Sequence, residues 1–191
     1  MLTDSAARWV LVLHTALGVV AVGAATHLVL WLRQYMNGQQ AKRRAVLRFA
    51  WLVLALQLGA FIAGNAMYPT YKVEVRAAYL ENPGAIRADD AARTSELDRI
   101  YAREGASRPR APATMDLVKR AAHAARWFDV KEHWIALGIL ASIALLLVLA
   151  FWDPRLGPAI KPIVMTLAVI AAGTIWLGAI IGVLTATWRA V

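Results

Sequence analysis

Residues 134–152 read WIALGILASIALLLVLAFW, a run of 19 residues without a charged side chain. A helix needs about 20 apolar residues to cross a hydrocarbon core of about 30 Å. Trp134 and Trp152 stand at the two ends of the run, and indole rings prefer the headgroup level of a membrane. The stretch therefore predicts a transmembrane helix over residues 132–152.

Three more uncharged runs of this kind lie between residues 9 and 32, 49 and 70, and 162 and 188. The 191-residue chain is 60% hydrophobic and 17% charged, which leaves too little polar surface for a soluble domain of this size. We expect an all-α integral membrane protein, with one membrane domain built as a four-transmembrane-helix bundle. The expected spans are 9–32, 48–69, 132–152 and 162–188, and the first is a retained helix rather than a cleaved signal peptide.

The net charge of +9 is explained by lipid headgroups rather than by nucleic acid, because the basic residues lie at the membrane boundaries and in one mixed-charge loop. The segment 33–48 carries five basic residues and no acid, and the short loop 153–162 adds two. Short basic loops stay in the cytoplasm. We therefore expect the termini and the long loop to face outward, in the inner (cytoplasmic) membrane of a prokaryote. The absence of cysteine excludes disulfides and thiolate metal sites within this chain.

A polar loop of about 60 residues, 70–131, joins the second and third spans. Pro69 should end the second helix, and the alternating pattern of 71–79 predicts an extended segment. Residues 88–105 predict a short helix stopped by Gly105, and 107–114 a proline-broken linker. Residues 114–128 predict an amphipathic helix in the headgroup region. Such a loop either caps the outer end of the bundle or is a solvated connector.

Polar residues inside the membrane usually mark function. His14, Asn65 and His133 all fall near the outer ends of their helices, so we expect them to form one layer. Two neutral imidazoles from different helices are the axial ligands of a b-type haem, and a four-helix bundle has room for the porphyrin. His14 and His133 are the candidate iron ligands. The alternative for each is a packing hydrogen bond to a threonine, glutamine or backbone carbonyl.

His27 is the weak member of the set, because it falls near the inner face without a histidine partner. Its 13-residue separation from His14 resembles respiratory b-type cytochromes, in which one helix supplies a ligand to each of two haems. The resemblance covers only this spacing, and no second helix carries a matching pair, since His123 and His133 are ten residues apart. The sequence therefore predicts at most one bis-histidine haem.

A quinone site is the second cofactor hypothesis. It needs a histidine and a hydroxyl or carboxyl group near an interface, with an apolar slot for the tail. His14, Tyr68, Glu132 and His133 are the candidate residues, with Asn65 as a surrounding polar group. Gln57 is expected to form an interhelical hydrogen bond instead.

The segment WFDVKEHW, residues 127–134, has the pattern of a helix start. Asp129 is the expected N-cap and Glu132 the third helical residue of a capping box. Lys131 is expected to contact headgroups. Small residues recur at four-residue spacing in 59–64 and 178–182, a pattern that allows close backbone approach. They are expected either to seal the second span against the fourth or to dock a partner subunit.

We expect the chain to be a small membrane subunit of an electron-transfer (respiratory-type) system that holds one haem b or lines a quinone site. The alternative is a non-catalytic subunit of a larger membrane protein complex, docking through its outer loop and small-residue helix faces. No nucleophile–base set, catalytic motif or deep carboxylate pair indicates an enzyme. Both hypotheses imply other membrane subunits as partners.

Overall fold

The computed structural model describes residues 4–155 and 157–187, and within these residues it is helical, without strands. Four stretches are long and apolar enough to cross a membrane, as the sequence predicts: Ser5–Met36, Gln40–Leu80, Thr114–Phe151 and Pro158–Thr185. Residue 188, the expected end of the last span, lies outside the described residues. The α-helices are α1 (Asp4–Met36), α2 (Arg43–Thr70), α3 (Pro83–Glu104), α4 (Thr114–Phe151) and α5 (Lys161–Thr187). Short 3-10 turns, η1 (Gln40–Lys42) and η3 (Pro158–Ile160), precede α2 and α5, and a π-helix, η2 (Tyr71–Leu80), continues α2.

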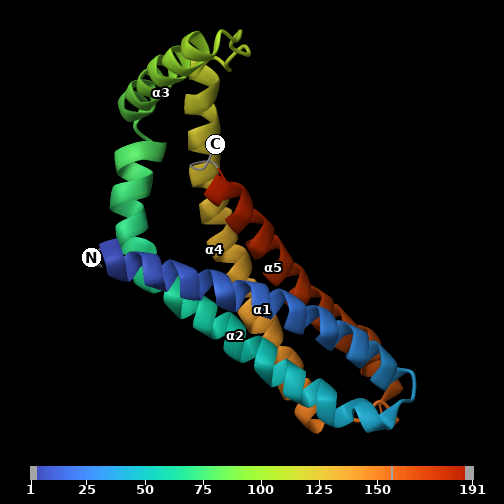
Figure 1. Ribbon diagram of the computed structural model, residues 1–191. Helices are drawn as coiled ribbons and strands as arrows, with labels where there is room; N and C mark the ends of the chain where they lie inside the picture. Colours follow the sequence, from blue (N-terminus) through green and yellow to red (C-terminus); the bar gives the residue numbers. More distant parts are fainter. Residues whose placement is uncertain (1–3, 156, 188–191) are drawn as a thin grey trace.

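The four long helices form two hairpins that cross each other (Figure 1). α1 packs along α2 and α4 along α5, while α1 also contacts α5 and α2 contacts α4. α1 and α4 are therefore diagonal partners in the bundle. We call the end with the turns 37–42 and 152–160 the inner end, and the end that carries 71–131 the outer end.

The apolar core lies in the inner half of the bundle. Side chains that are almost fully buried come from all four helices: Leu28, Leu32, Val46, Val53, Leu145, Leu149, Val164 and Ala168. By contrast, residues 5–20 of α1 include no buried side chain. The inner half thus holds the two hairpins together, and the outer half leaves their helices less covered by one another.

Residues 71–131 fold around a second, smaller core at the outer end. Leu80 and Ile86 pack against Ala121 and Ala125, which joins η2 and α3 to the first turns of α4. Asn82 caps α3 by accepting hydrogen bonds from two backbone N–H groups. Gly105 ends α3 with a left-handed φ of 63°, so the stop signal in the sequence is confirmed.

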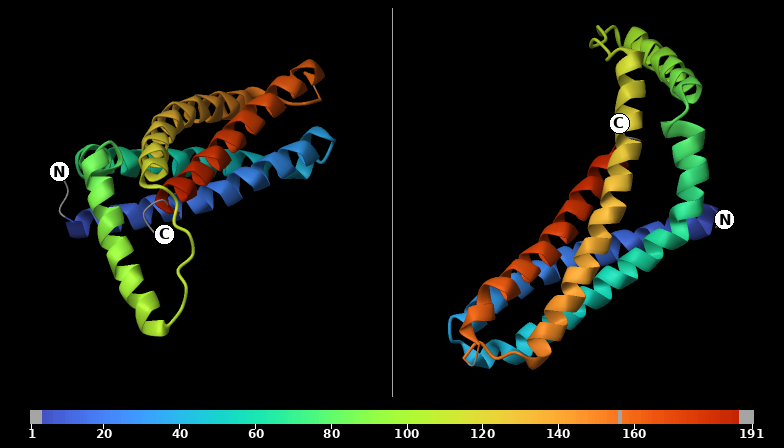
Figure 2. Two further views of the ribbon diagram at one scale, coloured as in Figure 1. Left: turned by 90° about the horizontal axis from the view of Figure 1, so that it is seen from above. Right: turned by 180° about the vertical axis from the view of Figure 1, so that it is seen from behind.

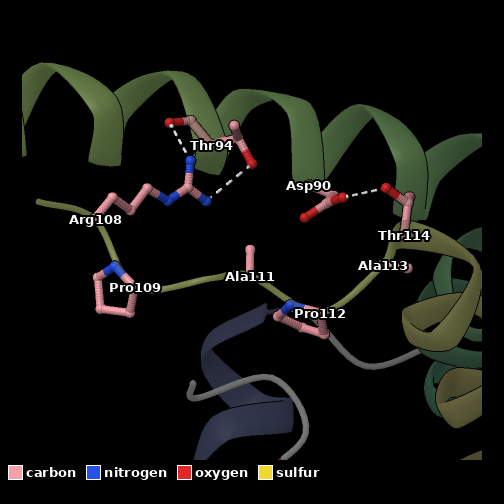
Figure 3. Close-up of a pocket in the computed structure, with 8 residues that line it drawn as sticks. All are labelled: Asp90, Thr94, Arg108, Pro109, Ala111, Pro112, Ala113 and Thr114. Carbon is pink, nitrogen blue, oxygen red and sulfur yellow. Dashed lines mark hydrogen bonds between the residues drawn. The ribbon is translucent and has the colours of Figure 1, made fainter.

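The proline-rich linker between α3 and α4 is tied back to α3 (Figure 3). Arg108 donates to Asp98 at 2.7 Å and to the backbone and hydroxyl oxygens of Thr94. The Thr114 hydroxyl donates to Asp90 at 2.7 Å. These bonds wall a small surface pocket and hold the linker against α3, which projects away from the four-helix bundle (Figure 2).

Two predictions for the chain around Pro69 are wrong. Pro69 lies inside α2, whose helical path continues through Thr70 into η2, and residues 71–79 are helical rather than extended. Proline removes one backbone donor and crowds the preceding turn, but it does not forbid helix on its C-terminal side. The backbone here changes to the wider π geometry, which brings Tyr71, Val75 and Tyr79 onto the second core.

The predicted break before the third span is also absent. α4 runs from Thr114 to Phe151 as one helix, so the amphipathic stretch 114–128 and the span 132–152 are parts of the same element. The N-cap position is Ala113, and Asp129 therefore lies mid-helix rather than at a helix start. No glycine or proline occurs between 114 and 137, and the alanine-rich turns there favour helix, so nothing interrupts it.

The small-residue faces pack within the hairpins. A Cβ on Gly64 would lie 3.3 Å from His14 of α1, and one on Gly59 would lie 3.4 Å from Leu17. A Cβ on Gly178 would lie 2.8 Å from Ile135 of α4. The expectation that these faces seal the second span against the fourth is wrong, because α2 faces α1 here and α5 faces α4.

Candidate cofactor site at the outer end of the bundle

His14 lies half-buried between α1 and α2. Its Nδ1 donates to the backbone oxygen of Ala60 at 2.8 Å. Gly64 gives the ring room, since a Cβ there would press on Cε1. Neither Thr15 nor Thr26, the sequence neighbours of the two α1 histidines, bonds an imidazole: their hydroxyls donate to their own helix, as threonines commonly do.

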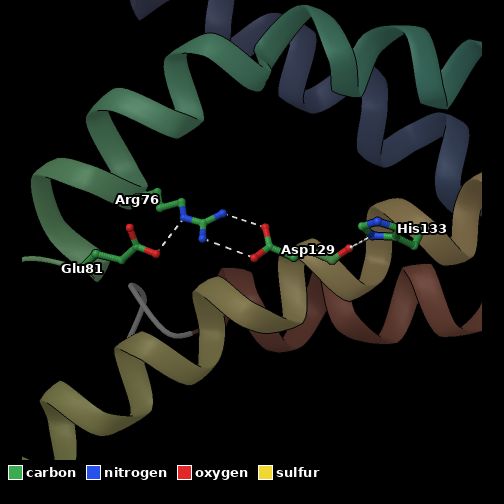
Figure 4. Close-up of polar contacts among 4 residues, drawn as sticks. All are labelled: Arg76, Glu81, Asp129 and His133. Atoms are coloured by element: carbon green, nitrogen blue, oxygen red, sulfur yellow. Dashed lines mark hydrogen bonds and ion pairs between the residues drawn. The ribbon is translucent and has the colours of Figure 1, made fainter.

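His133 is exposed on α4, and its Nδ1 donates to the backbone oxygen of Asp129 at 2.8 Å. His133 and Asp129 both project from the side of α4 that faces α2 and η2 (Figure 4). A carbonyl oxygen can only accept, so the proton sits on Nδ1 in His133 as it does in His14. In the neutral ring Nε2 then carries a lone pair, the protonation state that binds iron or accepts a hydrogen bond.

An ion-pair network joins η2 to α4 beside His133. The Arg76 guanidinium donates to both carboxylate oxygens of Asp129, at 2.6 and 3.2 Å, and to Glu81 at 2.8 Å. The two bonded residues, Arg76 and Asp129, are 53 positions apart in the chain. Asp129 thus receives Arg76 on its carboxylate and His133 on its backbone oxygen, which links the arginine to the imidazole through one residue (Figure 4).

Lys131 projects between α4 and α5 rather than only toward headgroups. Its Nζ lies 3.4 Å from the position of a Cβ on Gly182 and 5.6 Å from the centre of the Phe128 ring. Among residues 4–155 and 157–187, no carboxylate comes within ion-pair distance of it.

The remaining predicted residues also lie in the outer half, without hydrogen bonds to each other in the described part of the chain. Asn65 is exposed, whereas Tyr68 and Glu132 are half-buried. The Tyr68 ring lies 6.5 Å from that of Tyr71, which stacks on Phe128 at 4.0 Å. The Tyr71 hydroxyl is buried without a hydrogen-bond partner.

One polar contact inside the membrane involves a residue that the sequence analysis did not single out. The Ser142 hydroxyl donates to Gln57 Oε1 at 2.8 Å, and both side chains are only 3% exposed. The interhelical bond expected of Gln57 is therefore present, although its Nε2 has no partner. The sequence signal for this contact is Ser142 itself, a hydroxyl residue in an otherwise apolar span. Thr174 and Gly138 complete the contact, since a Cβ on Gly138 would lie 2.1 Å from Thr174 Oγ1.

His27 lies away from this site, near the inner end. It is exposed, and its Nδ1 donates to Gly23 of the same helix at 2.9 Å. Its ring lies 6.1 Å from both Trp31 and Phe49. Within the described residues, no group of three or more His, Asp or Glu side chains is placed to hold a metal ion.

The chain matches no protein-family model, and neither a curated protein nor a solved structure is significantly similar to it.

Proposed function

We propose that this protein is a membrane electron-transfer subunit that holds one b-type haem at the outer end of the bundle, with His14 and His133 as axial ligands. The observation that carries the proposal is the matched state of the two imidazoles. Each donates Nδ1–H to a backbone carbonyl, which leaves Nε2 as the ligand atom, and this is the usual arrangement around a metal-bound histidine.

The residues present fit such a group. His14 and His133 belong to α1 and α4, the diagonal pair, so a planar group between them would not have to replace a helix–helix interface. Gly64 leaves space for His14, and none of residues 5–20 of α1 has a buried side chain. Haem would supply a one-electron iron couple, and the chain's own residues would hold and orient it.

The positive groups at this end support the same proposal. Lys131 has no carboxylate partner among the described residues, and it lies on α4 two residues before His133. A b-type haem carries two carboxylates, which need cations or hydrogen-bond donors at a membrane interface. Lys131 supplies one such cation in the outer half, and it projects between α4 and α5.

The test is the absorption spectrum of the detergent-purified protein, expressed with added haem precursor. We expect a Soret peak that shifts on reduction, with about one haem per chain by pyridine haemochrome assay. A colourless protein obtained with adequate haem supply contradicts the proposal.

A quinone site is the second candidate, and unpaired donors favour it. Tyr71 and Thr70 each bury a hydroxyl that has no hydrogen-bond partner among the described residues, and Lys131 adds a cation. Quinone oxygens accept such bonds near an interface. The distinguishing result is a protein without a Soret peak from which organic extraction recovers a stoichiometric quinone.

The alternative, a non-catalytic subunit, has two expected docking surfaces, the outer loop and the small-residue helix faces, and the second is occupied within the chain. The glycine faces of α2 and α5 are used inside the chain, so only the outer segment is left as a docking surface. Recovery of neither haem nor quinone would favour this alternative.

A further inference from the structure

The inner end of the bundle concentrates positive charge that the protein does not neutralise. Residues 33–48 contain no acid, and their cations gather at the turn between α1 and α2: Arg33, Lys42, Arg43, Arg44 and Arg48. The loop between α4 and α5 reaches the same end and adds Arg155 and Lys161 (Figure 2). Asp153 is the single acid there, and its carboxylate accepts the backbone N–H of Arg155.

Three cations of the outer segment, by comparison, are neutralised by nearby carboxylates. Arg76, Arg99 and Arg108 each lie in an ion pair with a carboxylate. In the described part of the chain no ion pair involves the five cations of 33–48. Unpaired like charges repel one another, so this cluster is stabilised when an anion lies against it.

An aromatic ledge lies directly below Lys42, one of these cations. It consists of His27, Trp31 and Phe49, with the Trp31 and Phe49 rings 4.5 Å apart and edge to face. Lys42 stands over the Trp31 ring with Nζ 5.7 Å from its centre. The ledge spans the α1–α2 boundary, and the exposed side chains Leu30, Trp51 and Leu52 adjoin its residues in sequence.

We propose that the inner end binds an anionic phospholipid, with its phosphate against Lys42 and the neighbouring arginines and its acyl chains along the aromatic ledge. A phosphate accepts charge-assisted bonds from several cations at once, which relieves their repulsion. The apolar ledge below selects an amphiphile over free phosphate, since it contacts the chains and not the headgroup.

The test measures thermal unfolding of the detergent-solubilised protein with three additives: dioleoyl phosphatidylglycerol, dioleoyl phosphatidylcholine and inorganic phosphate. We expect phosphatidylglycerol to raise the midpoint by at least about 3 °C over phosphatidylcholine, because a ligand of the folded state stabilises it. Inorganic phosphate should have no comparable effect. The difference should disappear at about 1 M NaCl, where charge is screened within a few ångströms.

The triple variant Lys42→Ala/Arg43→Ala/Arg44→Ala should lose the phosphatidylglycerol effect. Its matched control, Lys119→Ala/Arg120→Ala/Arg126→Ala, removes the same charge from the outer part of α4 and should keep it. Equal losses in both variants would overturn the proposal, as would an equal response to both lipids in the wild type. Trp31→Leu gives a second measure, since it should weaken the lipid effect without changing the net charge. None of these outcomes depends on haem or quinone.

Discussion

Arg76 holds Asp129 with both of its terminal nitrogens, at 2.6 and 3.2 Å, and so fastens the extension of the second membrane helix to the middle of α4. Apolar packing between the hairpins is concentrated in the inner half. The Arg76–Asp129 ion pair and the stack of Tyr71 on Phe128 therefore join α4 to the extension of α2 in the outer half, where other contacts between α2 and α4 are few.

Replacing Asp129 by Asn should lower the free energy of unfolding by about 1 kcal/mol, because the pair is bidentate but its side chains are 23% and 43% exposed. Thermal unfolding in detergent measures it. Glu96→Gln is the control: it removes a 3.6 Å pair that is more exposed, and should have almost no effect. The interpretation fails if the two variants are equally destabilised.

His14→Ala and His133→Ala should each abolish the Soret peak of the purified protein, because a bis-histidine haem needs both Nε2 atoms. His27→Ala and His123→Ala should keep it, since His27 lies near the inner end and His123 is exposed among the outer turns of α4. Absorption spectra of the four variants, recorded at equal protein concentration, show which histidines the Soret peak requires. Loss of the peak in His123→Ala with its retention in His133→Ala would move the ligand to the other histidine.

Gly138→Ala should destabilise the bundle by roughly 1–3 kcal/mol, because the new methyl group would overlap Thr174 Oγ1 and Gln57 Nε2. Adding Thr174→Ala should recover part of the loss, which a thermal unfolding series would show. Gly173→Ala is the matched control on α5, since a Cβ there meets nothing within 4 Å. A Gly138→Ala protein as stable as that control would mean that α4 and α5 do not approach this closely.

Ser142→Ala should cost more stability than Gln57→Leu. Removing the serine leaves the whole Gln57 amide buried without a partner, whereas removing the glutamine lets the Ser142 hydroxyl donate to its own helix. The coupling energy in the double-mutant cycle should be about 0.6–1.7 kcal/mol, the range found for such bonds in membranes. If Gln57→Leu cost more stability than Ser142→Ala, a buried amide left without a partner would not explain the loss.

The four membrane helices were predictable because each depends on a local property, a long run without charge. What the sequence could not supply was the relation between helices. Asp129 has the residue type and spacing of an N-cap, and only the fold shows that its carboxylate faces Arg76, 53 positions earlier. The glycines at 59–64 were recognised as a close-packing face, but periodicity does not say which helix covers it.

The candidate site was predictable in part. Position along each helix placed His14, Tyr68, Glu132 and His133 in the outer half, where the structure has them. The hydrogen bonds of the two imidazoles to backbone carbonyls could not be predicted, since every residue offers a carbonyl and the sequence does not distinguish Ala60 from its neighbours. The bond of Ser142 to Gln57 could not be predicted, because a hydroxyl in a transmembrane helix usually bonds its own backbone.

The uninterrupted length of α4 makes it a lever. At roughly 1.5 Å per residue its 38 residues extend about 57 Å, close to twice the thickness of a hydrocarbon core. Its outer arm is packed into the folded segment of η2 and α3, its middle carries His133, and its far end reaches the basic inner turns. A displacement of the outer segment therefore reaches His133 and the inner end of the bundle through one unbroken helix.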